Sequence, residues 1–222
     1  MKQNGDETAS TSWRDVPASV IALGLVSLLM DISSELIHGL LPVFLTTVIG
    51  ASTLAIGLIE GVAEATVSIT KMFSGAISDR IGKRKLLVGI GYGLAAISKP
   101  VFPLAGTASE ILAARFLDRI GKGIREAPRD ALIADVTPSS IRGASYGLRQ
   151  ALDTTGAVAG PLLAVGLMAL YADNFRAVFW WAIVPGTRAT GIAIFSRTRS
   201  SPILAPVTLR RWSQKPWRSG NS

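Results

Sequence analysis

Apolar residues gather into six long stretches in this chain, separated by short polar connections. Each stretch is about 20 residues or longer, roughly the length that an α-helix needs to cross the hydrocarbon core of a bilayer. The stretches lie near Val16–Val48, Leu54–Ser78, Leu86–Ala105, Ile111–Ala134, Ala144–Leu170 and Phe175–Phe195. This pattern predicts an all-α membrane protein with six transmembrane helices, of which the first and the fourth are interrupted by charge.

The basic residues of the connections fall in alternate positions along the chain. The first and third connections, Ile49–Thr53 and Pro103–Ser109, contain no Lys or Arg, and the fifth, Tyr171–Arg176, contains one arginine. The fourth region contributes Arg129 and Arg142. The second connection contains four basic residues: Arg80, Lys83, Arg84 and Lys85. Because cytoplasmic loops are rich in Lys and Arg, this alternation predicts a cytoplasmic N-terminal segment (residues 1–15) and six crossings of the cytoplasmic (inner) cell membrane.

Composition agrees with lipid as the solvent of this chain. Of the 222 residues, 49% are hydrophobic and only 17% are charged, whereas a soluble domain carries about a quarter. The net charge of +8 does not point to nucleic acid as a partner, because the basic residues follow the loop pattern.

Few kinds of chemical site are compatible with the residues present. The chain has no cysteine and a single histidine, His38, which excludes disulfides, thiolate metal sites and multi-histidine metal sites. It contains no phosphate-binding P-loop and no nucleophile elbow. We therefore expect neither an enzyme nor a bound cofactor or metal.

The second connection carries a specific motif. The segment from Gly75 to Lys85 reads Gly-Ala-Ile-Ser-Asp-Arg-Ile-Gly-Lys-Arg-Lys, and it resembles the cytoplasmic loop signature of major facilitator superfamily transporters. Its glycines permit close packing and a tight turn, and its cations suit the anionic inner surface of the membrane. The resemblance assigns a gating role to seven residues: Gly75, Asp79, Arg80, Gly82, Lys83, Arg84 and Lys85. It implies in particular that Asp79 contacts the other half of such a transporter.

The resemblance implies a fold for residues 16–186. Six helices correspond to the N-terminal half of a facilitator transporter, built from two inverted three-helix repeats. A full member has about twelve helices, so we expect the chain to be cut short relative to one. The partners expected are a lipid bilayer, a small-molecule substrate, protons as a candidate, and either a missing C-terminal half or a second copy of the chain.

Charged residues occur inside the first predicted helix. Asp31, Glu35, His38 and Pro42 fall within an arc of about 60°, and ionisable groups in a spanning helix face a bundle interior or an aqueous cavity. Asp31 lies near the midpoint of the segment. Two interpretations remain open: the carboxylates contact protons or substrate, or they only neutralise cations on a neighbouring helix.

The second and fourth predicted helices carry further charges. Glu60, Glu64 and Lys71 share one stripe of the second helix. A stripe of about 120° on the fourth contains Arg115, Asp118, Arg119, Lys122, Arg125 and Arg129. Glu64, Arg115, Arg119 and Lys122 are therefore candidates for the substrate or proton pathway. Pairing of these cations with the acids of the first two helices explains the pattern with the fewest assumptions, and an anionic substrate is the alternative.

The fifth predicted helix contains Asp153, a further candidate for the pathway, followed by Gly156, Gly160 and Pro161. The last three residues are similar to the fifth-helix motif of antiporter-type facilitators. Small residues four apart permit close helix contact. The resemblance favours an exporter.

The segment after Gly186 differs in composition from the rest of the chain. Residues 187–222 contain no acidic residue and seven basic ones, and Arg188 falls within the predicted sixth helix. We hypothesise that residues 187–222 form an atypical basic tail that is out of frame. The alternative is a genuine basic cytoplasmic tail.

Together these features predict a secondary active transporter, or a truncated remnant of one. It would move a small solute by alternating access, driven by a proton gradient. The alternatives are a half-transporter that forms homodimers and a membrane scaffold or binding protein that transports nothing.

Overall fold

The computed structural model describes residues 16–195, which are all-helical and contain no strand. The elements are α1 (Ala18–His38), α2 (Leu41–Thr47), α3 (Thr53–Ile81), α4 (Arg84–Ser98), α5 (Val101–Leu104), α6 (Ala108–Val136), the 3₁₀ helix η2 (Ser139–Ile141), α7 (Arg142–Leu170) and α8 (Phe175–Phe195). The predicted fold class is confirmed. Most of the basic tail lies outside the described residues, and the part within them continues α8 to Phe195.

Two of the six predicted spans are broken near one end. The first is interrupted at Gly39–Leu40, before α2, which has Pro42 in its first turn, and the third at Lys99–Pro100, before α5. Proline lacks the N–H that would continue the hydrogen-bond ladder of a helix. The prediction that Pro42 lies on the same helical face as Asp31 was therefore wrong, because α1 ends at His38.

Five helical units are long and apolar enough to cross a membrane. They are α1 with α2, α3, α4 with α5, η2 with α7, and α8. The sixth span, α6, is as long as α3 at 29 residues but is rich in charge. Its charged stripe is turned inward, because Arg115, Asp118, Arg119, Arg125 and Arg129 are all buried. The bundle therefore keeps these charges away from its outer surface, as lipid requires.

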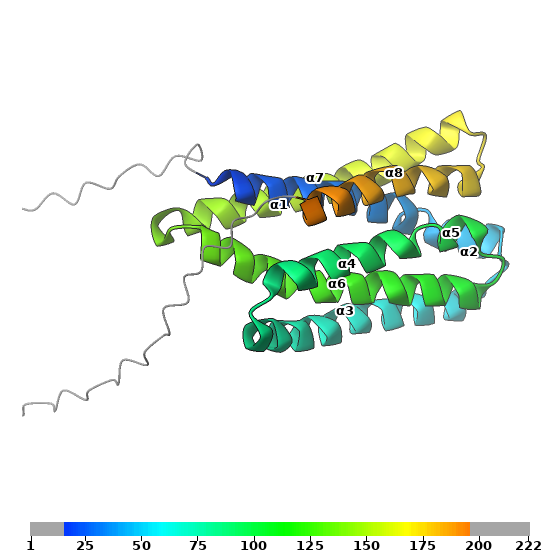
Figure 1. Ribbon diagram of the computed structural model, residues 1–222. Helices are drawn as coiled ribbons and strands as arrows, with labels where there is room; N and C mark the ends of the chain where they lie inside the picture. Colours follow the sequence, from blue (N-terminus) through cyan, green and yellow to red (C-terminus); the bar gives the residue numbers. More distant parts are fainter. Residues whose placement is uncertain (1–15, 196–222) are drawn as a thin grey trace, which may run out of the picture.

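The six spans form two groups of three, α1 with α7 and α8, and α6 with α3 and α4 (Figure 1). The α4–α8 contact joins the two groups. Exchanging the first three spans with the last three converts the α1–α7 contact into α6–α3 and the α1–α8 contact into α6–α4, and it leaves α4–α8 unchanged. Because α1 and α6 run in opposite directions in Figure 1, this is the symmetry of two inverted three-helix repeats.

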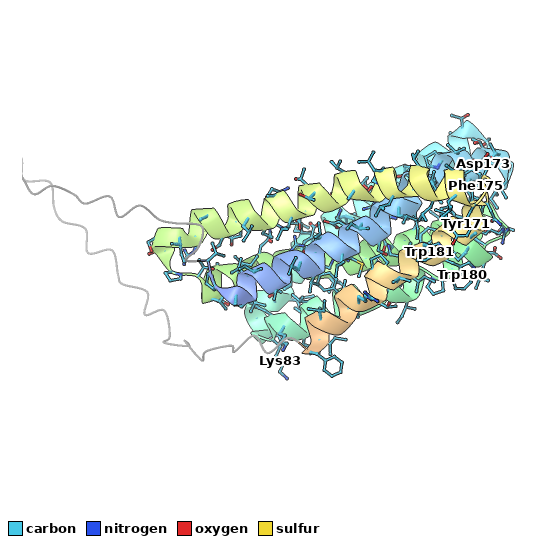
Figure 2. All side chains as sticks on the ribbon, turned by 90° about the horizontal axis from the view of Figure 1, so that it is seen from above. Lys83, Tyr171, Asp173, Phe175, Trp180 and Trp181 are labelled. Atoms are coloured by element: carbon cyan, nitrogen blue, oxygen red, sulfur yellow. The ribbon has the colours of Figure 1, made fainter. Side chains whose placement is uncertain are left out.

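The two ends of the bundle differ in chemistry. The turn between α3 and α4, the connection between α6 and α7, and both ends of the described chain lie at one end (Figure 1); we call it the basic end, after the cations of the α3–α4 turn. Figure 2 shows Lys83 at that end, and Tyr171, Phe175, Trp180 and Trp181 at the opposite end. The indole N–H of Trp181 donates to the Tyr171 hydroxyl at 2.8 Å. Such aromatic groups with a polar tip are typical of the membrane–water interface.

The charged helix α6 begins at a capping box. The Thr107 side chain accepts the backbone N–H of Glu110, and the Glu110 carboxylate accepts the N–H groups of Gly106 at 2.7 Å and Thr107 at 3.2 Å. These backbone donors hold the pKa of Glu110 below its usual range. The cap supplies acceptors for N–H groups at the helix start that have no backbone carbonyl partner within α6. It therefore fixes where the helix begins.

Two glycines bring α7 against the acidic part of α1. A Cβ added at Gly156 would lie 2.8 Å from the carbonyl oxygen of Leu28 and 2.9 Å from the Cβ of Asp31. A Cβ added at Gly160 would lie 2.7 Å from the Cβ of Glu35. The fifth-helix motif therefore allows α7 to pack directly on the turns of α1 that carry these carboxylates.

We predict that Gly156→Ala destabilises the bundle by about 1–3 kcal/mol, because the added methyl group must displace the α1 backbone. The matched control is Gly166→Ala in the same helix, where an added Cβ meets nothing within 4 Å and alanine favours the helix. Denaturant titration of the purified protein in detergent would measure both. Equal changes in stability for the two variants would contradict the close contact.

Candidate functional site

A polar pocket of about 350 Å³ lies between α1, α3, α6 and α7. Its charged lining consists of five carboxylates, Asp31, Glu35, Glu126, Asp130 and Asp153, and five cations, Lys71, Lys122, Arg125, Arg129 and Arg149. The opposite charges are equal in number, so the formal charge of the pocket is zero when all of these groups are ionised. In the described residues, no cluster of three or more His, Asp or Glu side chains is placed to hold a metal ion.

Four of these charges form a closed ring between α6 and α7. Arg129 lies 3.7 Å from Asp130 and 3.4 Å from Asp153, and Arg149 lies 3.3 Å from Asp130 and 3.0 Å from Asp153. Each arginine thus faces both aspartates. Arg129 also donates to Ser27 of α1. The ring forms the wall of the pocket towards the basic end and ties α7 to α6.

Three further ion pairs connect α3 to α6 like the rungs of a ladder. Arg115 pairs with Glu60, Arg119 lies 3.3 Å from Glu64, and Lys71 lies 3.0 Å from Glu126. The partners in every rung are 55 residues apart, because the two helices run in the same direction and stay in register. The structure thus contains the pairing expected between the acids of the second span and cations of the fourth.

After this pairing, four charged groups of the pocket remain without a close opposite charge. Asp31 and Glu35 lie on α1, and Lys122 and Arg125 lie on α6. Within the described residues, Asp31, Lys122 and Arg125 have no ion pair at 4.0 Å or less, and Glu35 approaches only His38, at 3.8 Å. The pocket therefore has an acidic wall on α1 and a basic wall on α6 whose charges are not committed to each other.

A second group of polar residues is buried beside the pocket, where α1, α4 and α6 meet. Lys99, which has no exposed surface, lies 2.9 Å from Asp118 and donates to Ser34 at 2.8 Å. His38 lies 3.5 Å from the other oxygen of Asp118 and 3.4 Å from Arg119. This buried network joins three helices by ion pairs and hydrogen bonds, and removal of Lys99 would leave the buried Asp118 carboxylate without its ammonium partner.

The candidate residues predicted from the sequence divide between these places. Asp31, Glu35, Lys122 and Asp153 line the pocket. The others lie in the ladder or the buried network: His38, Glu64, Arg115 and Arg119. The structure thus gathers half of the candidates into one cavity.

Sequence reasoning missed Lys99 and Arg149. Both are charges inside predicted apolar spans, Leu86–Ala105 and Ala144–Leu170, so the rule that singled out Asp31 would have found them. Asp130 also lies inside a predicted span, Ile111–Ala134, but the sequence does not show that Arg149 of α7 lies opposite it.

The loop motif is organised by Arg84. Its guanidinium lies 3.3 Å from Asp79, pairs with Asp135 of α6, and donates to the carbonyl oxygen of Ala131 at 3.2 Å. Gly82 adopts a left-handed conformation (φ +67°) that ends α3, which glycine adopts without steric cost. The turn is thus fixed to the end of α6, and the gating role of Asp79 stays a prediction.

Comparison with known proteins connects this architecture to one group. The family model of the Major Facilitator Superfamily matches residues 23–219. An uncharacterized MFS-type transporter from Methanocaldococcus jannaschii is 34% identical over 197 residues, which cover 89% of this chain and 49% of the relative. The quinolone resistance protein NorA from Staphylococcus aureus is 29% identical over 126 residues, 57% of this chain and 32% of the relative.

Among solved structures, a D-xylose-proton symporter has a similar fold, with a TM-score of 0.60 and 20% identity over 80% of this chain and 47% of the symporter chain. The present chain spans about half the length of the curated relatives that it matches over most of its own length.

We predict that Lys99→Met destabilises the protein by about 3–5 kcal/mol, because it leaves the Asp118 carboxylate buried without its ammonium partner. The double variant Lys99→Met/Asp118→Leu removes both charges and should be less destabilised than the single variant. Thermal unfolding in detergent would measure this. A double variant less stable than Lys99→Met would show that the pair is not the reason for the loss.

Proposed function

The chain belongs to the major facilitator superfamily, and we propose that its six-helix bundle acts as the N-terminal half of a secondary active transporter that moves a small solute across the cytoplasmic membrane. The observation that carries this proposal is the charge-lined pocket between α1, α3, α6 and α7. In the proposed mechanism, two such bundles rock about a central site, which opens first to one side of the membrane and then to the other.

The open side of the pocket supports a second bundle as the cover. The outward faces of α3 and α7 are apolar and exposed, for example at Leu58, Phe73 and Leu162, and lipid can cover them. Lipid cannot cover the charged lining of the pocket, because ionised groups facing hydrocarbon are costly. We propose that a C-terminal half or a second copy of this chain completes the cavity.

Asp31 is the proposed site of proton coupling. It faces Lys122, Arg125 and Arg129 from α6 and Asp153 from α7, with Glu35 one turn away on its own helix. Because none of these cations lies within 4.0 Å of its carboxylate, Asp31 can take up a proton without breaking a direct ion pair. A gain or loss of this charge alters the balance of charge between the acidic wall on α1 and the basic wall on α6.

Export is the proposed direction of transport. The Gly156, Gly160 and Pro161 motif supports it, as does the similarity to a protein named for quinolone resistance. The basic end is proposed to face the cytoplasm, with the N-terminal segment on the same side.

We predict that the pocket is reachable from both sides of the membrane and that Asp31 controls the balance between them. A single cysteine at Ala157, which lines the pocket, gives a unique reporter, because the chain has none of its own. Its labelling by an impermeant thiol reagent should occur from either side of oriented vesicles. The ratio of the two rates should change when the pH is lowered, because a pocket carboxylate can take up a proton.

Asp31→Asn should abolish this change in the ratio, because an amide cannot take up the proton. Asp173→Asn is the matched control, since Asp173 is exposed at the opposite end of the bundle from the basic turn. A cysteine at the exposed Ser109 corrects for the intrinsic pH dependence of the thiol reaction. Labelling from one side only, or a pH response that survives in Asp31→Asn, would refute the proposed function.

A further inference from the structure

Arg125 is a buried charge whose donors lack acceptors. Only 3% of its surface is exposed, and its Nη1 atom has no hydrogen-bond partner. No carboxylate of the described residues lies within 4.0 Å of the guanidinium. The other pocket arginines differ, because Arg129 and Arg149 each face two aspartates.

The Tyr92 ring holds this guanidinium in place without satisfying it. The central carbon of the Arg125 guanidinium lies 4.8 Å from the ring centroid, and the Tyr92 hydroxyl is itself hydrogen-bonded to Ser27 at 3.0 Å. A cation over an aromatic face is stabilised electrostatically, but the ring offers no acceptor in the plane of the N–H groups. The N–H groups in the plane of the Arg125 guanidinium are therefore free to donate to a ligand.

Lys122 lies one turn before Arg125 on α6 and lines the same pocket. It too has no carboxylate within 4.0 Å in the described part of the chain. Residues three apart on a helix are neighbours on one face. The basic wall therefore presents a guanidinium fork and an ammonium group together.

Leaving a buried charged donor unsatisfied costs more than leaving a neutral one, so the arrangement favours a ligand that supplies negative oxygen atoms. We propose that Arg125 and Lys122 bind the oxyanion, a carboxylate or phosphate group, of a small organic molecule. A guanidinium matches such a group with two parallel hydrogen bonds, and an ammonium adds a point charge. The inference names the substrate class of the transporter proposed above and rests on that function.

The acidic wall explains how such an anion would be coupled to a proton. Asp31 and Glu35 face the basic wall across a pocket of about 350 Å³, a volume near the lower end of small-molecule sites. An ionised Asp31 repels an entering oxyanion and competes for the same cations. Protonation of Asp31 removes that competition, so the anion should bind more tightly when Asp31 is protonated.

The test measures equilibrium binding to the purified 222-residue chain, with four probes that share one ring: benzoate, phenyl phosphate, benzylammonium and benzyl alcohol. At least one of the two anions should bind, and it should bind at least about tenfold more tightly than benzyl alcohol. Arg125→Gln should weaken its binding by about tenfold or more. Arg125→Lys retains the charge but not the forked pair of N–H donors, so its affinity for the anion should lie between those of the unchanged chain and of Arg125→Gln.

Arg142→Gln is the matched control, because it removes one exposed arginine at the start of α7, outside the pocket lining, and should leave the affinity unchanged. Asp31→Asn should strengthen anion binding, because it removes the competing carboxylate. Circular dichroism of each unliganded variant would show that a loss of binding does not reflect unfolding.

Three results would overturn the proposal. They are the failure of both anions to bind, equal or tighter binding of benzylammonium or benzyl alcohol, and an affinity that Arg125→Gln leaves unchanged in the folded protein. Anion binding that depends on Arg125, in a chain whose Ala157→Cys reporter is reached from one side only, would support the anion site and refute the transport proposal. A reporter that is reached from both sides, in a chain that binds neither anion, would support the transport proposal and refute the anion site. The two failures can therefore be told apart.

Discussion

The exclusion of the α6 charges from lipid is the constraint on which the rest of this bundle depends. A helix with this many ionised groups can lie at membrane depth only if other helices surround its charged stripe. α3 supplies Glu60, Glu64 and Lys71, the break between α4 and α5 supplies the buried Lys99, and α7 supplies Asp153 and Arg149. The neighbours of α6 are thus fixed by charge as well as by shape. The pocket lies beside Lys122 and Arg125, the α6 charges that these neighbours leave without a close carboxylate.

The inverted symmetry gives the two groups of helices the same packing plan but different chemistry. α6 meets α3 through ion pairs as well as a close contact at Gly123, whereas its counterpart α1 meets α7 through the close contacts at Gly156 and Gly160. Close backbone contact needs no charge, which leaves the carboxylates of α1 uncommitted. The same fold therefore pairs most charges of α6 but not Lys122 and Arg125, and it leaves Asp31 and Glu35 of α1 uncommitted.

Sequence alone predicted the spans, the inward direction of the polar stripe and the loop motif, because each depends on local composition or spacing. It did not predict the breaks at Gly39 and at Lys99–Pro100, where a proline within an apolar stretch ended the helix. It also could not tell which cations would be paired. Arg115 and Arg125 look alike in the sequence, and only the packing of α3 against α6 gives the first a partner and leaves the second without one.

Because the partners in the ladder keep a constant offset of 55 residues, a one-turn slide of α6 along α3 brings new charges opposite each other. A shift of one turn towards the basic end would place Arg115 opposite Glu64, an attractive pair, but also Lys122 opposite Lys71, so that like charges meet. The same shift towards the aromatic end would place Arg119 opposite Glu60 and Asp130 opposite Lys71, so that two attractive pairs form again. One-turn displacements of packed helices are a known way for proteins to change state. The charge order of these two helices therefore disfavours a one-turn movement of α6 towards the basic end more than the opposite movement.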